Sequence, residues 1–240
     1  MIDKTRGIIL HTVKYGDNSL ILTIYTDKFG RQSYIINGAR NSRSKNKAGL
    51  LQPLFIVDLE IYHKNGRDLQ RIKEIKISSP FTTIPFDVIK TTQVIFISGI
   101  LYKIILEEEQ NTDMFHFIES SLMFFDIMDS GKPDFHVWFL SHLTNYLGIV
   151  PNTPEKIDGW LDMKKGSMVV SEPPHPEYMN QEISSLFKEL LKLRITDLPY
   201  FKISRENRAQ LLAKILEYYQ IHFGNVVSLK SSEILKEVFH

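Results

Sequence analysis

Short apolar stretches separated by turn residues fill the first 80 positions of the chain. Three of these stretches are rich in Ile, Tyr, Thr and Val, and they cover residues 7–15, 19–26 and 31–38. Turns that contain glycine, at 15–18 and 27–30, lie between them. Because β-branched and aromatic residues favour strands and glycine favours tight turns, the pattern predicts three strands.

Two further stretches bring the number of predicted strands to five. They cover residues 50–64 and 68–77 and meet at Asn65-Gly66, a pair typical of a β-hairpin turn. In the second of them, neither face alternates cleanly between apolar and polar residues. Five strands within so short a segment predict a small closed barrel, and we expect the five-stranded OB-fold.

The pattern changes to a helical period after residues 78–87, where Pro, Ser and Thr concentrate. Apolar residues then recur at helical spacing in six segments, which are 88–109, 113–130, 133–148, 181–194, 204–223 and 228–240. We therefore expect a mixed fold, with an OB-fold domain over residues 1–80 and an all-α domain over residues 81–240. An irregular segment with five prolines, 151–179, interrupts the second domain.

Composition narrows the class of protein without naming a function. Of the 240 residues, 43% are hydrophobic and 24% are charged, as in a folded globular chain. No stretch approaches the ~20 uninterrupted apolar residues of a membrane span, and the N-terminus lacks the pattern of a signal peptide. Cysteine is absent, which excludes disulfides and thiolate metal sites. We expect a cytoplasmic protein.

Charge is distributed unevenly between the two predicted domains. Residues 1–80 contain 14 Lys and Arg against 7 Asp and Glu, whereas residues 81–240 contain 15 against 21. A basic first domain and an acidic second one suggest different partners for the two.

A basic loop follows the third predicted strand. Between Asn37 and Gly49 the chain carries Arg40, Arg43, Lys45 and Lys47 and no acid. Such a run predicts a surface loop, either as solvated charge or as a contact for nucleic-acid phosphates. Further cations near strand ends that could join this contact are Lys4, Arg6, Lys14 and Arg31. Tyr15, Phe29, Tyr25 and Tyr34 could stack on bases, although Tyr25 and Tyr34 could equally be barrel core.

Enzymatic motifs for nucleotide binding, hydrolysis or zinc peptidase chemistry are missing. His136 and His142 share a predicted helix but are six residues apart, which favours structural histidines over a metal pair. Asp58 and Glu60 could hold Mg²⁺ in a nuclease, but the apolar residues that alternate with them favour an outward face of an ordinary strand. Residues 107–109, three glutamates, are expected to close a helix in solvent.

Two parts of the sequence resemble the RecO family of bacterial recombination mediators. The first is GIILHTVKYGDNSLILTIYTDKFGRQSYIINGARNSRSK (7–45), with its Tyr-Gly-Asp turn, Gly-Arg pair and Gly-Ala-Arg element. The second comprises ENRAQLLAKILEYYQIHF (206–223) and LKSSEILKE (229–237). These matches lie at both ends of the chain, while the helices between them are not diagnostic.

The resemblance implies an N-terminal OB-fold, a helical C-terminal domain and a nucleoid-associated role in recombinational DNA repair. It also implies binding of single- and double-stranded DNA and annealing of complementary strands without ATP. The implied partners are RecR and the C-terminal tail of single-stranded DNA-binding protein, with help in loading RecA. Many members carry a four-cysteine zinc module, which this chain cannot form, so we expect no cofactor and packing of Trp160, Leu161, Met168 and Val169 in its place.

Residues for the partner proteins are less clearly marked. Lys202, Arg205 and Arg208 lie at the start of a predicted helix, where cations face the positive end of the helix dipole. Arg205 and Arg208 are candidates for the acidic tail of single-stranded DNA-binding protein, or they pair with acids of their own domain. Two other functions stay open: a protein adaptor that binds DNA only weakly, and the metal-dependent nuclease.

Overall fold

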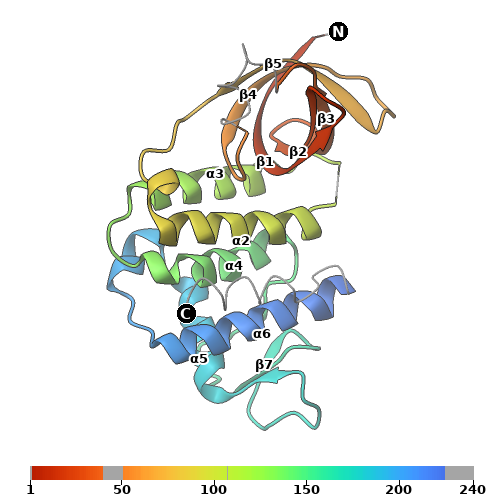
Figure 1. Cartoon of the computed structure of the whole chain (residues 1–240). Helices are drawn as coiled ribbons and strands as arrows, with labels where there is room; N and C mark the ends of the chain where they lie inside the picture. The colour runs from red at the N-terminus through yellow and green to blue at the C-terminus, as the bar shows by residue number, and fades with distance from the viewer. Residues whose placement is uncertain (1, 40–50, 107, 225–240) are drawn as a thin grey trace. The chain divides into compact units, whose positions relative to one another are not determined.

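The computed structural model describes residues 2–39, 51–106 and 108–224. They divide into two compact units, residues 1–127 and 128–240 (Figure 1). Among these residues no helix is long and apolar enough to cross a membrane. The basic loop and the predicted helix at 228–240 lie outside the described residues, as does Glu107.

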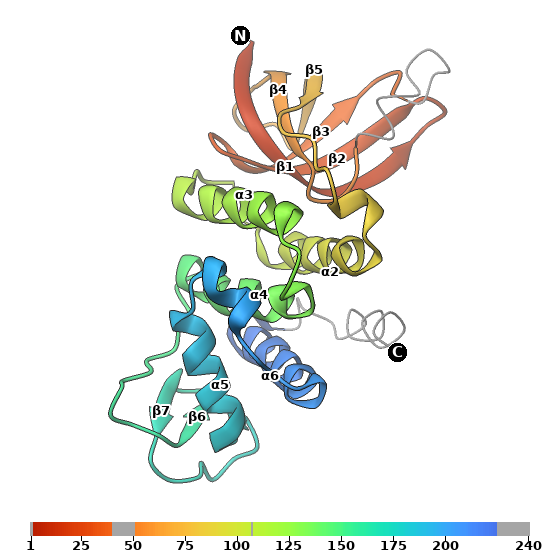
Figure 2. The ribbon, with the colours of Figure 1, turned by 90° about the vertical axis from the view of Figure 1, so that its left-hand side faces the viewer.

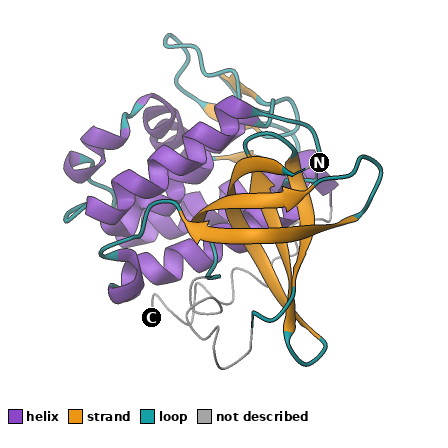
Figure 3. Cartoon of the chain, turned by 90° about the horizontal axis from the view of Figure 1, so that it is seen from above, coloured by secondary structure: helices purple, strands orange, loops and turns teal. Residues whose placement is uncertain are grey.

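Five strands form a closed barrel in the first unit (Figures 1 and 3). They are β1 (Asp3–Tyr15), β2 (Ser19–Thr26), β3 (Gly30–Ile36), β4 (Ile56–Tyr62) and β5 (Leu69–Ile77). Their order around the barrel is β1-β2-β3-β5-β4, and β4 closes it on β1. All pairs are antiparallel except β3 with β5, which is parallel. The predicted OB-fold is confirmed.

A β-bulge in β5 explains why its sequence does not alternate. Glu60 pairs with Glu74 and Ile61 with Ile72, so Lys73 is an extra residue on β5. Beyond the bulge the inward position shifts, and Ile72 and Ile75 are both buried although they are three positions apart, an odd spacing that a regular strand would put on opposite faces. Because the bulge shifts the inward positions by one residue, strict alternation cannot predict which residues of β5 face the core.

Two helices pack against the barrel within the first unit, α2 (Val88–Ile104) and α3 (Thr112–Ile127). Helix α2 begins at Asp87, whose side chain accepts hydrogen bonds from the backbone N–H groups of Ile89 and Lys90. Ser98 of this helix donates a hydrogen bond of 2.7 Å to the carbonyl of Leu10 in β1. The helix ends five residues before the sequence predicted.

The segment that links barrel and helices is held by a buried carboxylate. Asp126 of α3 accepts hydrogen bonds from the backbone N–H groups of Thr82, Thr83 and Ile84 at 2.7–2.8 Å. Burial acts to raise the pKa of Asp126, but these bonds outweigh it and lower that pKa. The change from strands to helices near residue 80 therefore lies inside one compact unit, and a boundary there between separate domains stays a prediction.

The second unit is a set of helices with a small sheet (Figure 2). Its helices are α4 (Phe135–Tyr146), α5 (Gln181–Lys192) and α6 (Arg205–Phe223), with the short 3-10 helices η3 (Lys132–Asp134) and η4 (Ile195–Tyr200). Polar groups of buried side chains form hydrogen bonds with the backbone. Trp138 donates to the carbonyl of Leu193, and Tyr219 donates to that of Leu140. The predicted helical region is confirmed.

The segment expected to be irregular contains regular structure. Strands β6 (Trp160–Asp162), β7 (Ser167–Val169) and β8 (Tyr178–Met179) form a sheet of order β7-β6-β8. Each is only two or three residues long. Strands this short carry too few residues for a period of two to be recognised in the sequence.

The turn glycine Gly30 is constrained twice, by its backbone and by its surroundings. Its φ is +59°, and a Cβ placed on it would lie 2.4 Å from the carbonyl oxygen of Glu109. Gly66 has a φ of +72° and no atom near such a Cβ.

Gly66→Ala should cost ~1–2 kcal/mol of unfolding free energy from backbone strain alone. Gly30→Ala should cost ~1–3 kcal/mol more, because the neighbouring backbone must shift.

Urea unfolding of the two variants measures the difference directly. Equal reductions in stability for Gly30→Ala and Gly66→Ala would show that segment 108–109 does not pack against the β2–β3 turn.

Candidate nucleic-acid interface

Both stems of the basic loop are anchored at one end of the barrel. On the N-terminal side, Ser19 Oγ donates a hydrogen bond of 3.2 Å to Asn37 Oδ1, and Ala39 is buried. On the C-terminal side, Thr12 Oγ1 donates to the carbonyl of Leu51 at 3.2 Å. The loop therefore leaves and re-enters the barrel beside the end of β1 and the start of β2.

Two of the residues that the sequence predicted are exposed at this end, next to Asp17 and Asn18 of the β1–β2 turn. Lys14 and Tyr15 close β1, and both are exposed, Tyr15 by 54%. A cation and an aromatic ring are the groups that contact the phosphates and bases of a single strand. Arg40, Arg43, Lys45 and Lys47, the four cations of the predicted loop, lie outside the described residues.

Two other predicted cations lie on the first half of β1. Lys4 is exposed and forms an ion pair of 3.3 Å with Glu60. Arg6 forms an ion pair of 2.5 Å with Glu119 of α3, and its guanidinium lies 5.6 Å from the centre of the Phe115 ring. Arg6 thus joins the barrel to α3, and the structure does not bring it together with Lys14.

Arg31 binds the C-terminal end of α2. Its Nη1 donates to the carbonyl oxygens of Tyr102 and Ile105 at 2.7 and 2.6 Å, and its guanidinium lies 4.7 Å from the centre of the Tyr102 ring. A helix C-terminus carries partial negative charge and carbonyls without helical partners, so a cation there is stabilising. From the sequence, Arg31 is a strand residue that follows a glycine, and nothing near it predicts a contact with the end of α2.

The predicted aromatic residues divide into core and surface. Tyr25 and Tyr34 are buried and belong to the core, which settles the alternative left open by the sequence. Phe29, in the β2–β3 turn, stacks on His63 with 4.1 Å between ring centres and 20° between planes. Of the four, only Tyr15 and Phe29 are placed where a base could reach them.

Surface residues that the sequence did not single out lie beside the N-terminal stem. A hollow of about 220 Å³ is lined by Asn37 and by Tyr62, Arg71 and Lys73, whose side chains are exposed. These residues come from β4 and β5, and the bulge at Lys73 is what turns Arg71 and Lys73 both outward. The sequence showed that this strand is charged, but it did not show that Arg71 and Lys73 lie on the outer face of the barrel.

Asp58 and Glu60 are not arranged as a metal pair. Glu60 lies 2.8 Å from Lys73 and 3.3 Å from Lys4. Hydrogen bonds from these lysines, the one from Lys73 most of all, lower the pKa of Glu60. Asp58 lies opposite Arg6 and Lys76 in the barrel. Among the described residues no group of three or more His, Cys, Asp or Glu could hold a metal ion.

The predicted partner residues lie at the start of α6. Arg208 forms an ion pair of 2.7 Å with Asp134, and both side chains are largely covered. Burial raises the pKa of Asp134 against the opposing effect of this arginine. Beside them His136 is buried, and burial, aided by the charge of Arg208, lowers its pKa to about 3. Arg208 therefore has an acidic partner within its own unit, while Arg205 is exposed.

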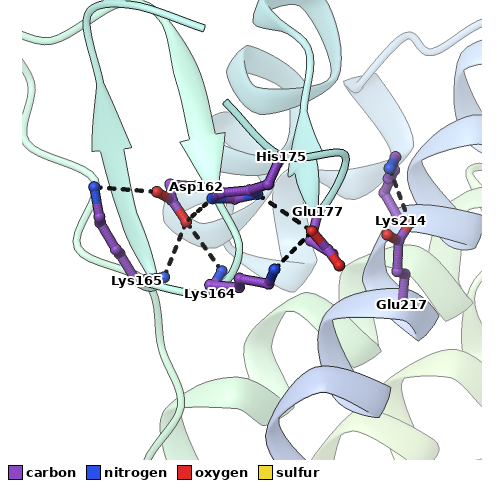
Figure 4. A network of polar contacts seen from close by, with 7 residues as sticks. All are labelled: Asp162, Lys164, Lys165, His175, Glu177, Lys214 and Glu217. Atoms are coloured by element: carbon purple, nitrogen blue, oxygen red, sulfur yellow. Dashed lines mark hydrogen bonds and ion pairs between the residues drawn. The ribbon is translucent and has the colours of Figure 1, made fainter. Parts of the chain in front are cut away.

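A polar network ties the small sheet together where the resemblance implied a zinc module in other members (Figure 4). Asp162, which is buried, accepts hydrogen bonds from the backbone N–H groups of Lys164 and Lys165 at 3.1 and 3.0 Å. Burial acts to raise its pKa, and the bonds from Lys165 outweigh this and lower it. His175 lies 3.4 Å from both Asp162 and Glu177.

The apolar packing expected in this segment is present in part. Leu161 and Met168 are buried, and Trp160 and Val169 are half-buried. Charge and packing together hold the described residues of this segment.

Comparison with known proteins covers the whole chain. The family model described as "Recombination protein O N terminal" matches residues 1–81, and "Recombination protein O C terminal" matches residues 85–233. A protein named DNA repair protein RecO from Bacteroides fragilis is 34% identical over 241 residues, covering all of both chains. The protein of the same name from Flavobacterium psychrophilum is 37% identical and covers 98% of each chain.

The role of Arg31 can be measured separately from DNA binding. Arg31→Ala should lower the free energy of unfolding by ~1.5–3 kcal/mol, because two carbonyls are left without a charged donor. Arg71→Ala, at an exposed arginine of another barrel strand, should change it by no more than ~0.5 kcal/mol. If Arg31→Ala keeps full stability but flattens the salt dependence of DNA binding, Arg31 contacts phosphate and does not cap α2.

The buried carboxylate of the small sheet gives a second measurement. Asp162→Ala should cost ~2 kcal/mol of unfolding free energy, because two part-buried backbone donors are left without their acceptor. Asp158→Ala, at a carboxylate that is 94% exposed, serves as the control and should be nearly neutral. A metal chelator should leave the thermal midpoint of the wild type unchanged; a clear drop would indicate a structural metal.

Proposed function

The chain belongs to the RecO family, and from this premise we propose that it acts in DNA repair and recombination by binding DNA through its barrel. The observation that carries the proposal is the anchoring of both stems of the basic loop beside Lys14 and Tyr15. A barrel of OB topology that presents cations and an aromatic ring on one end has the surface that single-stranded nucleic acid requires.

The arginines and lysines of the loop would act on the sugar–phosphate backbone. Guanidinium groups can bind two phosphate oxygens at once, and lysines contribute mobile point charges. Contacts of this kind carry no sequence information, so we expect binding without sequence preference.

Annealing of complementary strands follows from the same chemistry. Two DNA strands repel each other through their phosphates, and a protein that screens this charge lets them meet. No bond is made or broken in the protein's action, so no catalytic residue and no ATP are needed. We propose annealing, and with it a non-enzymatic role, on these grounds.

Partner proteins would complete the role as a mediator. The names of the relatives concern DNA repair, and the family resemblance implies RecR, the tail of single-stranded DNA-binding protein and, indirectly, RecA. Arg205 and Arg208 are the candidates for the acidic tail, and Arg208 would have to release Asp134 to bind it. The second unit would be the region for such contacts.

Two alternatives make different predictions. An adaptor would bind its partner proteins and show only weak affinity for DNA. A nuclease would cleave an oligonucleotide with Mg²⁺, and the two lysines on Glu60 argue against it.

The basic loop is tested by the binding of a fluorescent single-stranded oligonucleotide across a salt series. A variant with Arg40, Arg43, Lys45 and Lys47 changed to Ala should bind more weakly. Its log–log salt slope should flatten by up to ~0.7 for each phosphate that the variant no longer binds. Annealing of two labelled complementary strands without ATP should slow in parallel.

The control removes the same charge from the second unit. Lys156, Lys165, Lys192 and Lys202 are exposed there, and their change to Ala should leave the slope nearly as in the wild type. Equal effects of the two quadruple variants would show that only net charge matters and would remove the loop from the site.

A further inference from the structure

We propose that a single DNA strand bound by this protein runs along the seam between β3 and β5 and ends at the β4–β5 loop. The seam track consists of Phe29, Tyr62, His63, Lys64, Arg67 and Arg71. This inference rests on the proposed function, because it assigns a path to the DNA that the barrel is proposed to bind.

The face that OB-folds commonly use is covered by the protein's own helices at one end. Nucleic acid often lies across the outer face of strands 2 and 3 of an OB-fold and against its β1–β2 and β4–β5 loops. Here the Tyr25 hydroxyl of β2 donates to the carbonyl of Asn111, its ring lies 6.1 Å from that of Phe115, and Thr23 is buried. On β3, Arg31 is engaged by the end of α2. A strand of DNA can therefore keep the β4–β5 loop but must leave the covered end of the β2–β3 face.

The seam offers an open path that begins at the stem of the basic loop. Strands β3 and β5 pair over only three positions, from Ser33 with Leu69 to Ile35 with Arg71. The hollow of about 220 Å³ described above lies at the C-terminal end of β3, where Asn37 meets Tyr62 and Arg71. The stem of the loop and the seam are thus continuous.

A second hollow continues the path toward the other end of β3. It has a volume of about 310 Å³ and is lined by Phe29 and Lys28 of the β2–β3 turn and by His63, Lys64 and Arg67 of the β4–β5 loop. Tyr62 lines the first hollow and His63, the next residue, lines the second. The two hollows are therefore neighbours along the chain of β4 and its loop.

Three cations of the track are available to phosphate. Lys64, Arg67 and Arg71 are exposed, and none forms an ion pair with another residue in the part of the chain that the structure describes. Lys73 differs from them, because Glu60 holds it at 2.8 Å. Glu108 lines the second hollow and offsets part of its positive charge. Exposed cations without acidic partners are the residues expected to exchange counterions for phosphate.

Aromatic rings alternate with these cations. Tyr62 is 42% exposed in the first hollow, and the stacked pair of Phe29 and His63 lies in the second. Nδ1 of His63 is buried and has no hydrogen-bond partner within the described structure, while Nε2 lies 3.0 Å from Asn65 Oδ1. Rings between cations form the stacking platform of proteins that bind single strands without sequence preference.

The length of the seam fits a short single strand. Eight residue steps separate Phe29 from Asn37, and a strand rises ~3.3 Å per residue, so the path is roughly 26 Å long. OB-folds bind about 4–16 nucleotides each, which matches a path of this length.

The test uses the full-length protein and an oligothymidine with a fluorescent end. The variant Lys64→Ala/Arg67→Ala/Arg71→Ala should bind ~10-fold more weakly, with a salt slope reduced by up to ~0.7 for each of the three cations removed. The control, Lys156→Ala/Lys192→Ala/Lys202→Ala, removes the same formal charge from the second unit, where Lys192 is paired with Glu155, and should bind within about twofold of the wild type. Tyr62→Ala should weaken binding, whereas Tyr200→Ala, at a tyrosine 82% exposed in the second unit, should not.

Photocrosslinking of the wild-type protein tests the path without any variant. Peptides that contain Phe29 or Tyr62 should carry the crosslinked thymine. Crosslinks confined to Tyr15 or to the second unit, or a triple variant that binds like its control, would overturn the track while wild-type binding upheld the proposed function. Absence of DNA binding by the wild type would overturn both.

Discussion

The hydrogen bonds of Arg31 with the end of α2 decide which surface of the barrel is left for a ligand. One guanidinium joins a strand of the barrel to two helix carbonyls and to the ring of Tyr102. Together with the bond from Tyr25 to Asn111 and the ion pair of Arg6 with Glu119, it holds α2 and α3 against the barrel. Helices lie against β2 and the start of β3, so the surfaces left open on the described barrel include the stems of the basic loop and the β3–β5 seam. They also include a hollow of about 460 Å³ on β1, β4 and β5, whose lining mixes lysines with the acids Asp27, Asp58, Glu60 and Glu74.

Formal charge is therefore a poor guide to function on this barrel until partners are known. Arg6, Arg31 and Arg71 are all strand arginines in the basic first third of the chain. Arg6 binds a group of α3 and Arg31 binds groups of α2, whereas Arg71 is exposed. A cation that is already paired must give up one partner to bind a phosphate, whereas an exposed cation releases only water and counterions. The same reasoning applies to Arg208, which Asp134 engages in the second unit.

The small sheet of the second unit shows how one local constraint can replace another. Without cysteine the chain cannot build a thiolate zinc site, and Asp162 instead accepts backbone N–H bonds in the turn between β6 and β7. Leu161 and Met168 supply the buried apolar area. A buried carboxylate that accepts two backbone hydrogen bonds fixes the conformation of one short turn.

The sequence by itself determined the five strands, their glycine turns, most of the helices and the position of the basic loop. These features depend on local patterns: β-branched residues, glycine at positive φ, and apolar residues at helical spacing. It also determined that Lys14 and Tyr15 end a strand, whereas the hydrogen bonds of the structure put the stems of the loop beside them. Only the tertiary structure decided that Tyr25 and Tyr34 are core, that Arg31 caps a helix 71 residues away, and that the bulge at Lys73 turns Arg71 outward. The physical reason is that burial, long-range hydrogen bonds and strand register depend on which segments meet in space. A local sequence pattern does not contain that information.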